Sequence, residues 1–229
     1  IVADIIVSAL DPYYTYKHLL NNKYKNKQFK KALKKENKHP VVSCFNVYFS
    51  TSADISLLDI PEGLNIEPFK VGSKDTNVLI IRPYYFDNHF TKDGKNIISV
   101  LIDQNSADFK YWDKLHNESI TNYKNEEKLI INTIIERITS YYGNLKNNLE
   151  VITWFGPKDL ERRTNTTYGA LQSFSFGKSL FISNRKKIKI KNLYLSSQWN
   201  KSVGGMPMAG FNAKSEAKDI ISKYKEEDK

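Results

Sequence analysis

A glycine pair near the C-terminal end is the clearest candidate for ligand-binding chemistry. Gly204-Gly205 follows a short apolar run, Leu193-Tyr-Leu195, and precedes residues 209–223, whose alanines and isoleucines recur at helical spacing. This order predicts a strand, a glycine-rich turn and a helix. The N–H groups at a helix start are unpaired, and glycine lets a ligand approach the main chain. The stretch is therefore a candidate cradle for a phosphate or for the oxygen edge of a cofactor ring, although such a turn is also ordinary turn chemistry.

A second strand-and-helix pattern opens the chain. Ile5-Ile-Val7 is a β-branched run that is typical of a buried strand. Asp11-Pro12 then favours a helix start, with Asp as the cap and Pro at the first helical position. Because the chain begins with Ile1 inside this apparent strand and lacks an initiator Met, we expect it to be a piece of a longer protein.

The middle of the chain predicts a sheet. The apolar runs cover residues 41–50, 66–71, 78–82, 97–102 and 149–153. Turn-rich stretches join several of them, at residues 72–77 and at Asp93-Gly94, which indicates antiparallel or mixed pairing. Residues 122–142 carry the strongest helical periodicity, and we expect that helix on one face of the sheet. Residues 23–38 predict a basic surface helix. The fold class is α+β.

Composition argues against several classes of function. The net charge is +10, but only five of the 35 basic residues are Arg, the preferred reader of bases and phosphates, so we expect no nucleic-acid partner. Cys44 is the single cysteine and predicts a buried thiol in a reducing, cytoplasmic compartment. No Cys/His cluster has metal-binding spacing, and no apolar run is long enough to span a membrane. Contact with an acidic lipid surface stays open.

Three segments together resemble signatures of the phytoene desaturase, carotenoid isomerase and retinol saturase family of flavoproteins. Residues 3–20 are similar to the family pattern AD-x-VVSNADP-x-x-TY-x-x-LL. Residues 154–170 resemble a Thr-Pro-x-Asp-x-Glu helix followed by a glycine-rich stretch, here Gly169-Ala170 and Gly177. Residues 193–209 resemble LYLAG followed by GGG-x-P-x-A. Val203 replaces the third glycine and Ser196-Ser197 replace Ala-Gly, and both changes would crowd a cofactor.

The resemblance implies a domain layout and a site. It places the end of the first FAD-domain crossing at 1–20, a substrate-binding domain at 21–191, and the returning strand and helix of the FAD domain at 192–229. These terminal pieces would be fragments of a Rossmann-like domain, with Ser8 and Ser197 close together on parallel strands. The implied cofactor-binding residues are Ser8, Ala9, Ser197, Gly204, Gly205, Met206, Pro207, Met208 and Ala209. The implied substrate-binding residues are Tyr168, Gly169 and Trp199.

The implied activity is that of a flavin-dependent oxidoreductase. It would act on a hydrophobic, polyene-like substrate by hydride transfer or flavin-assisted isomerisation, with the chemistry supplied by FAD. We assign no general acid or base; Arg82, His89 and Tyr168 are the side chains considered for such a role. The chain lacks G-x-G-x-x-G, so we expect it to hold no FAD and to be inactive by itself.

Two other classes of function stay open. One is a flavin-free interaction or substrate-binding module that keeps the fold, which the missing G-x-G-x-x-G motif favours. The other is a basic nucleic-acid-binding domain, which the low Arg content disfavours. If the terminal strands lack their sheet neighbours, residues 1–9 and 193–197 should pair with each other, with a second copy or with a substitute surface.

Overall fold

The computed structural model describes residues 3–24, 26–56, 58–85, 94–175, 190–200 and 204–227, without the side chains of residues 28, 226 and 227. The chain divides into two compact units. Unit 1 joins the two ends of the chain, Ile1–Ser43 and Leu160–Lys229, and unit 2 is the continuous segment Cys44–Asp159. The domain limits given by the family resemblance, with a substrate domain at 21–191, stay a prediction.

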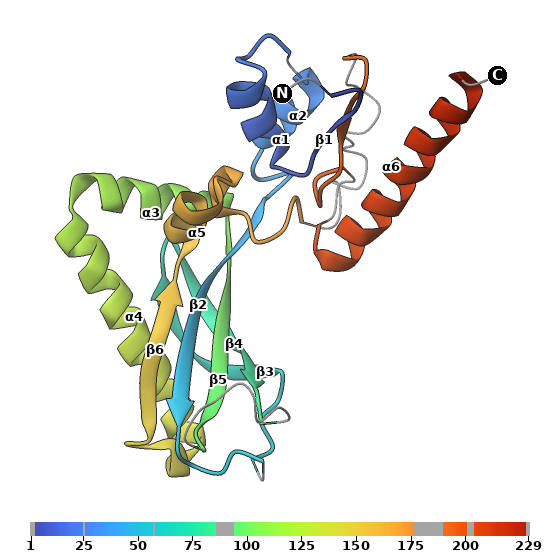
Figure 1. The fold of residues 1–229 in the computed structure, drawn as a ribbon. Helices are drawn as coiled ribbons and strands as arrows, with labels where there is room; N and C mark the ends of the chain where they lie inside the picture. Colours follow the sequence, from blue (N-terminus) through green and yellow to red (C-terminus); the bar gives the residue numbers. More distant parts are fainter. Residues whose placement is uncertain are drawn as a thin grey trace. The chain divides into compact units, whose positions relative to one another are not determined.

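Unit 2 is built on a five-stranded antiparallel sheet with the strand order β3-β4-β5-β2-β6 (Figure 1). The strands are β2 Val42–Thr51, β3 Gly63–Val71, β4 Lys74–Pro83, β5 Asn96–Asn105 and β6 Leu149–Phe155. Each coincides with one of the five predicted apolar runs, so the predicted sheet is confirmed. Helices α3 (Ser106–Glu118) and α4 (Ile120–Tyr141) follow β5, and the short 3-10 helix η2 (Gly143–Leu145) leads into β6.

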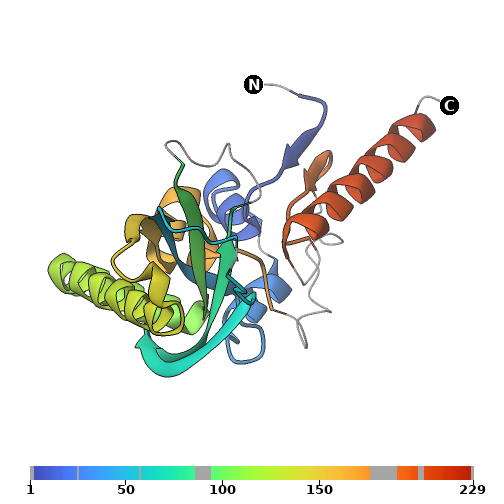
Figure 2. The ribbon, with the colours of Figure 1, turned by 90° about the horizontal axis from the view of Figure 1, so that it is seen from below.

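The core of unit 2 lies between the sheet and these helices. Alternate residues of β2, Phe45, Val47 and Phe49, point to one face and are fully buried. Trp112 of α3 stacks on Phe45 with ring centroids 5.8 Å apart. Ile134 of α4 joins the same cluster at 0% exposure. The predicted helix over residues 122–142 is therefore confirmed as α4, which runs beside the sheet in Figures 1 and 2.

Two local predictions are wrong. Residues 72–77 are not an extended turn, because β4 begins at Lys74 and leaves a two-residue connection from β3. Gly72 makes that turn with φ +66°, a left-handed conformation that favours glycine. Residues 23–38 do not form one surface helix: α2 covers Lys27–Leu33, and both Phe29 and Leu33 are buried. The side chain of Asn26 caps the start of α2 by accepting from the N–H of Phe29, and the buried Phe29 and Leu33 turn one side of the helix into the core of unit 1.

Unit 1 is organised by a parallel pair of short strands. β1 (Ile6–Ser8) pairs with β7 (Leu193–Leu195), with Ile6 opposite Leu193 and Ser8 opposite Leu195. The prediction that these distant segments are parallel neighbours is confirmed. The other elements are α1 Pro12–Tyr14, the π-helix η1 Thr15–Leu19, α5 Pro157–Thr164, the 3-10 helix η3 Thr167–Gly169 and α6 Met206–Glu227. α5 contains the boundary between the units.

Candidate functional site

The C-terminal ends of β1 and β7 lie side by side, so the loops that contain the predicted site residues Ala9 and Ser197 are neighbours. The N–H of Ser196, the residue after β7, donates to the carbonyl of Ser8 at the end of β1 at 2.9 Å. Ser197, the next residue, therefore lies close to Ser8, as predicted. Both are buried, at 8% and 6% exposure, while Ala9 is exposed. In a parallel pair the carboxyl ends lie at the same edge, where ligands bind in open α/β sheets.

Asp11 fixes the loop after β1. One carboxylate oxygen accepts from the N–H of Tyr13 at 2.7 Å and caps α1, as predicted. The other accepts from the N–H of Thr167, also at 2.7 Å, and joins segments 156 residues apart. Burial raises the pKa of Asp11, and the bonds from Thr167 and Tyr13 offset part of this rise. Thr15 continues the network through a 2.8 Å hydroxyl contact with Ser8.

Two asparagines brace the loop after β7. The Asn200 side chain accepts from the N–H of Ser197 at 3.1 Å and donates to the carbonyl of Leu195. Asn212 of α6 donates to the carbonyl of Ser197 at 2.9 Å. Both asparagines are buried and both satisfy main-chain groups, which is the usual condition for burying an amide. The backbone of Ser197 is therefore held both by its own loop and by α6.

The two glycines of the pair have different roles. A Cβ on Gly204 would overlap the backbone nitrogen of Ser173, so this glycine is required by the packing of the chain itself. Gly205 has φ +107°, and a Cβ there would meet no atom of the described residues closer than 3.8 Å. Its N–H donates to Oε1 of Gln198 at 3.2 Å. Gly205, unlike Gly204, thus has room for a Cβ at ordinary van der Waals distance from Gln172 and Pro207.

α6 begins directly after this glycine pair. Met206 is 90% exposed and Pro207 is exposed, while Met208 and Ala209 are partly buried. The N–H of Ala209 donates to the carbonyl of Gly205 at 3.0 Å, so intrahelical bonding starts there. Pro207 has no N–H to offer a ligand. The less crowded Gly205, next to a helix start, fits the edge of a flat cofactor better than Gly204, where the backbone of Ser173 occupies the Cβ position.

The three predicted substrate residues lie in unit 1 but differ in accessibility. Trp199 is 2% exposed, and its ring contacts those of Phe29 and Phe174 edge-on at 5.7 and 5.4 Å. Gly169 is buried, and its carbonyl accepts from the Ser43 hydroxyl at 2.6 Å. Tyr168 is half-buried in a left-handed conformation, φ 58°. Their role toward a substrate stays a prediction, and of the three Tyr168 is the most accessible.

The Tyr168 hydroxyl is committed to a local contact. It donates to Glu36 at 3.4 Å, and burial, followed by the negative charge of Glu36, raises its pKa. Arg82 lies on β4 of unit 2, is exposed, and pairs with Glu62 at 3.8 Å. His89, Gly177 and Val203 lie outside the described residues. Tyr168 and Arg82 are thus engaged by acidic side chains, and the two carboxylate oxygens of Asp11 accept from backbone N–H groups.

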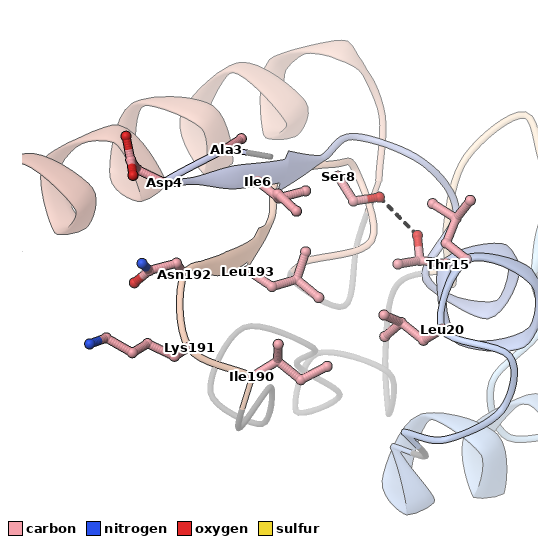
Figure 3. A pocket seen from close by; sticks show the side chains of 11 residues that line it. Ala3, Asp4, Ile6, Ser8, Thr15, Leu20, Ile190, Lys191, Asn192 and Leu193 are labelled. Atoms are coloured by element: carbon pink, nitrogen blue, oxygen red, sulfur yellow. Dashed lines mark hydrogen bonds between the residues drawn. The ribbon is translucent and has the colours of Figure 1, made fainter. Parts of the chain in front are cut away.

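A cavity of about 540 Å³ opens on one face of the strand pair (Figure 3). Ile6, Leu193 and Ile190 supply apolar side chains from the strands and from the approach to β7, and Leu20 supplies another from the far side. The Ser8–Thr15 hydroxyl pair lies at that same far end, and the remaining lining residues are Ala3, Asp4, Leu19, Lys191 and Asn192. The volume falls within the usual range for small-molecule sites.

Sequence reasoning missed the residues that hold this site together. The second bond of Asp11 and the bond of Asn212 to Ser197 join segments that no local pattern relates, whereas Gln198 and Asn200 bond to backbone groups three to seven residues away. Their residue types carried a weak signal, because Asn and Asp in loops commonly bond to nearby backbone.

The described residues include neither a metal-ligand cluster nor a helix suited to crossing a membrane. No group of three or more His, Cys, Asp or Glu side chains there is arranged to hold a metal ion. None of the helices in that part of the chain combines the length and apolar character that a membrane span requires.

Comparison with known proteins gives one distant relative. No family model matches the chain, and no solved structure matches it. All-trans-retinol 13,14-reductase of Danio rerio is 27% identical over 161 residues, which cover 66% of this chain and 26% of the reductase. The chain thus spans about a quarter of the length of this curated relative. By sequence it is a distant homologue of an enzyme named for the reduction of retinol.

Proposed function

We propose that this chain is the substrate-binding and partly flavin-binding portion of an FAD-dependent oxidoreductase. The reaction would be hydride transfer to or from a hydrophobic, polyene-like substrate such as a retinoid, or flavin-assisted isomerisation of one of its double bonds. The terminal segments would complete a Rossmann-like FAD domain, and unit 2 would belong to the substrate domain. The distant retinol reductase relative supports the oxidoreductase class and the type of substrate.

The parallel pairing of β1 with β7 carries this proposal. The family resemblance predicts that these two segments are neighbours, although they lie near opposite ends of the sequence. The observed register, with Ile6 opposite Leu193, is compatible with two strands of one parallel FAD-domain sheet. The pairing brings the Ser8-Ala9 loop to the Ser197 loop, as a shared cofactor crevice requires.

The residues of this crevice suggest separate roles. Gly205 would let the main chain approach the cofactor, and the start of α6 would favour a negatively charged or electron-rich edge. Asn200 and Asn212 would hold the Ser197 backbone still, and Asp11 would do the same for the loop after β1. FAD, when bound, would supply the hydride chemistry. The protein would supply orientation and an apolar surface for the substrate.

A flavin-retention experiment on the full-length gene product tests this function. We expect purified wild-type protein to carry yellow cofactor, and Gly205→Trp to lose it, because an indole would occupy the side from which a cofactor approaches the main chain. Gly205→Ala carries the same backbone strain at φ +107° without the indole and should keep more flavin, and Gly210→Trp, with no described atom within 4 Å of its Cβ position, controls for a Trp on α6. Stoichiometric flavin in Gly205→Trp would refute the assignment of this loop.

The cavity favours a second candidate function. A flavin-free module that binds an apolar ligand needs only the hollow on β1 and β7, which residues of this chain form on their own. Titration of the 229-residue chain with retinol, followed by retinol fluorescence, separates the two functions. Saturable binding that Leu193→Asp abolishes would support the module, whereas binding that requires flavin-loaded full-length protein would support the oxidoreductase.

A further inference from the structure

One end of the cavity on β1 and β7 is polar. There the hydroxyl groups of Ser8, on β1, and Thr15, the first residue of η1, lie 2.8 Å apart. Both residues are buried, at 6% and 1% exposure, and both line the cavity. Figure 3 shows the pair at the end where Leu20 lies. The direction of the bond between the two hydroxyls decides what this end of the cavity offers to a ligand.

The Thr15 hydroxyl has an acceptor of its own. It donates to the carbonyl of Asp11, four residues earlier, at 3.2 Å. A hydroxyl group carries one hydrogen and two lone pairs, so a Thr15 hydroxyl that donates to Asp11 must accept from Ser8. In the reverse order, the Ser8 hydrogen would have no acceptor among the hydrogen bonds of the described residues, which is rare for a buried donor. The network therefore runs from Ser8 to Thr15 to the Asp11 carbonyl.

This order uses the hydrogen of each hydroxyl within the protein. Lone pairs remain on Ser8 Oγ and on Thr15 Oγ1, so the polar end of the cavity accepts hydrogen bonds and has no hydrogen to give. A solvent molecule at this end must donate a hydrogen to the protein. A ligand group that displaces it has to donate as well, because otherwise that bond is lost and affinity falls.

The rest of the cavity sets the shape of the ligand. Its volume is about 540 Å³, and apolar side chains of the two strands form its walls. The charged lining residues, Asp4 and Lys191, are exposed and lie in Figure 3 at the opposite end from Ser8. Between the two ends the lining matches an apolar body, which is the usual composition of small-molecule sites with few polar groups.

We propose that this cavity binds a molecule with a long apolar chain that ends in a hydroxyl group, and that this hydroxyl donates to Ser8 Oγ. The proposal rests on the second candidate function, the flavin-free binding module, and names the chemical class of its ligand. The apolar chain lies against Ile6 and Leu193, and its other end points toward Asp4 and Lys191. An ether, an aldehyde or an ionised carboxylate brings only acceptors to Ser8 and is disfavoured there.

Calorimetric titration of the 229-residue chain with matched probes tests the role of the hydroxyl. Decanol and methyl nonyl ether have the same number of carbon and oxygen atoms, but only decanol has a hydrogen to donate. We expect decanol to bind about 10-fold more tightly, which is the usual effect of one hydrogen bond. Decanoate should also bind more weakly than decanol, because its charged head is repelled by the lone pairs at Ser8. Leu193→Asp should abolish the binding of decanol.

Substitutions at the polar end give a signature that a merely structural role would not produce. Thr15→Val keeps the size of the side chain and releases the Ser8 hydrogen, so the ether should bind more tightly and the preference for decanol should shrink. Ser8→Ala combined with Thr15→Val removes both oxygens, and the two probes should then bind equally. Thr133→Val is the matched control, because Thr133 on α4 of unit 2 also donates to a carbonyl four residues earlier, that of Leu129, at 2.9 Å. It should leave both affinities unchanged.

The outcomes separate this inference from the function on which it rests. Retinol binding without a preference for decanol over the ether would keep the module and overturn the hydroxyl assignment. Tighter binding of decanoate, or decanol binding that Leu193→Asp leaves unchanged, would overturn it as well. No binding of retinol or of either probe would overturn the module together with this inference. The wild-type comparison needs no substitution, so it decides the matter even where a variant does not fold.

Discussion

Unit 2 and unit 1 differ in how completely their strands are covered. In β5 of unit 2, Ile98, Val100 and Ile102 are at most 1% exposed. In β1 of unit 1, the consecutive residues Ile6 and Val7 are 55% and 50% exposed. Since consecutive strand residues point to opposite faces, both faces of β1 are largely uncovered. Parallel sheets are normally buried on both faces. The strand pair of unit 1 therefore lacks the covering layers that such a sheet usually has, whereas the helices of unit 2 cover a face of its sheet.

The contrast extends to what holds each unit together. Unit 2 has a continuous aliphatic and aromatic core between the sheet and two helices. Unit 1 has a smaller aromatic cluster, in which Phe29, Phe174 and Trp199 meet edge-on, and it depends on polar ties such as Asp11 to Thr167. We therefore expect unit 2 to be the more stable part of the isolated chain, and unit 1 to gain stability from whatever covers β1.

The largest effect should come from a cavity in the core of unit 2. Ile134→Ala removes a side chain that is 0% exposed, and should lower the free energy of unfolding by about 2–5 kcal/mol. Urea denaturation followed by circular dichroism measures this change. Leu129→Ala on the same helix is the control, because Leu129 is 62% exposed and its loss should change stability little. Equal effects of the two substitutions would contradict the assigned core.

Gly72→Ala should destabilise unit 2 through backbone strain and through a close contact with Trp112. Gly94→Ala, which has the strain without the contact, separates these two causes. Gly72 has φ +66°, and a Cβ there would lie 2.9 Å from the Trp112 indole nitrogen. Gly94 has a similar φ of +70° but open space around its Cβ position. We expect a loss of about 1 kcal/mol for Gly94→Ala from backbone strain alone, and about 2 kcal/mol or more for Gly72→Ala. The order of their Tm values is the measurement, and the reverse order would contradict the contact with Trp112.

Asp11→Ala should act on unit 1 and spare unit 2. It removes the cap of α1 and the bond from Thr167, and we expect a loss of about 1–3 kcal/mol in the stability of unit 1. Hydrogen exchange by residue distinguishes the units: the amides of Tyr13 and Thr167 should lose protection, while those of β5 should not. Asp54→Ala is a matched control, because Asp54 caps a local turn in unit 2 and is not buried. Uniform loss of protection in both units would show that they unfold together.

The smallest effect should come from β1 itself. Val7→Ser replaces a side chain that is half-exposed in this chain, so its stability should change by about 0.5 kcal/mol or less. In a full-length protein that covers β1, the same substitution should cost about 1–2 kcal/mol, since a buried apolar side chain is then lost. Comparing the Tm shifts in the two proteins measures how much of β1 becomes covered. Equal small shifts in both would show that this strand stays exposed.

The sequence predicted unit 2 better than unit 1, for a physical reason. The strands of unit 2 are regular apolar runs of 7–10 residues, and α4 spans 22, so their periodicity is strong. β1 and β7 have three residues each, too few for a period, and their pairing followed only from the family resemblance. The burial of Phe29 and Leu33 could not be predicted, because they share a cluster with Phe174 and Trp199, far along the chain.

The candidate site shows the same limit. Gly204 and Gly205 were both predicted to bind the cofactor. Their surroundings differ, because Ser173 packs against Gly204 and not against Gly205.

The division of unit 1 between two distant segments has a consequence for its synthesis. The segment Ile1–Ser43 cannot complete its fold until Leu160 and the residues after it have left the ribosome. At a translation rate of about 5–20 residues per second, the delay is on the order of ten seconds. During this time Tyr16, Phe29 and Leu33 have no aromatic cluster to join, whereas unit 2 can already fold. The nascent N-terminal segment is therefore the part of this chain most in need of a chaperone.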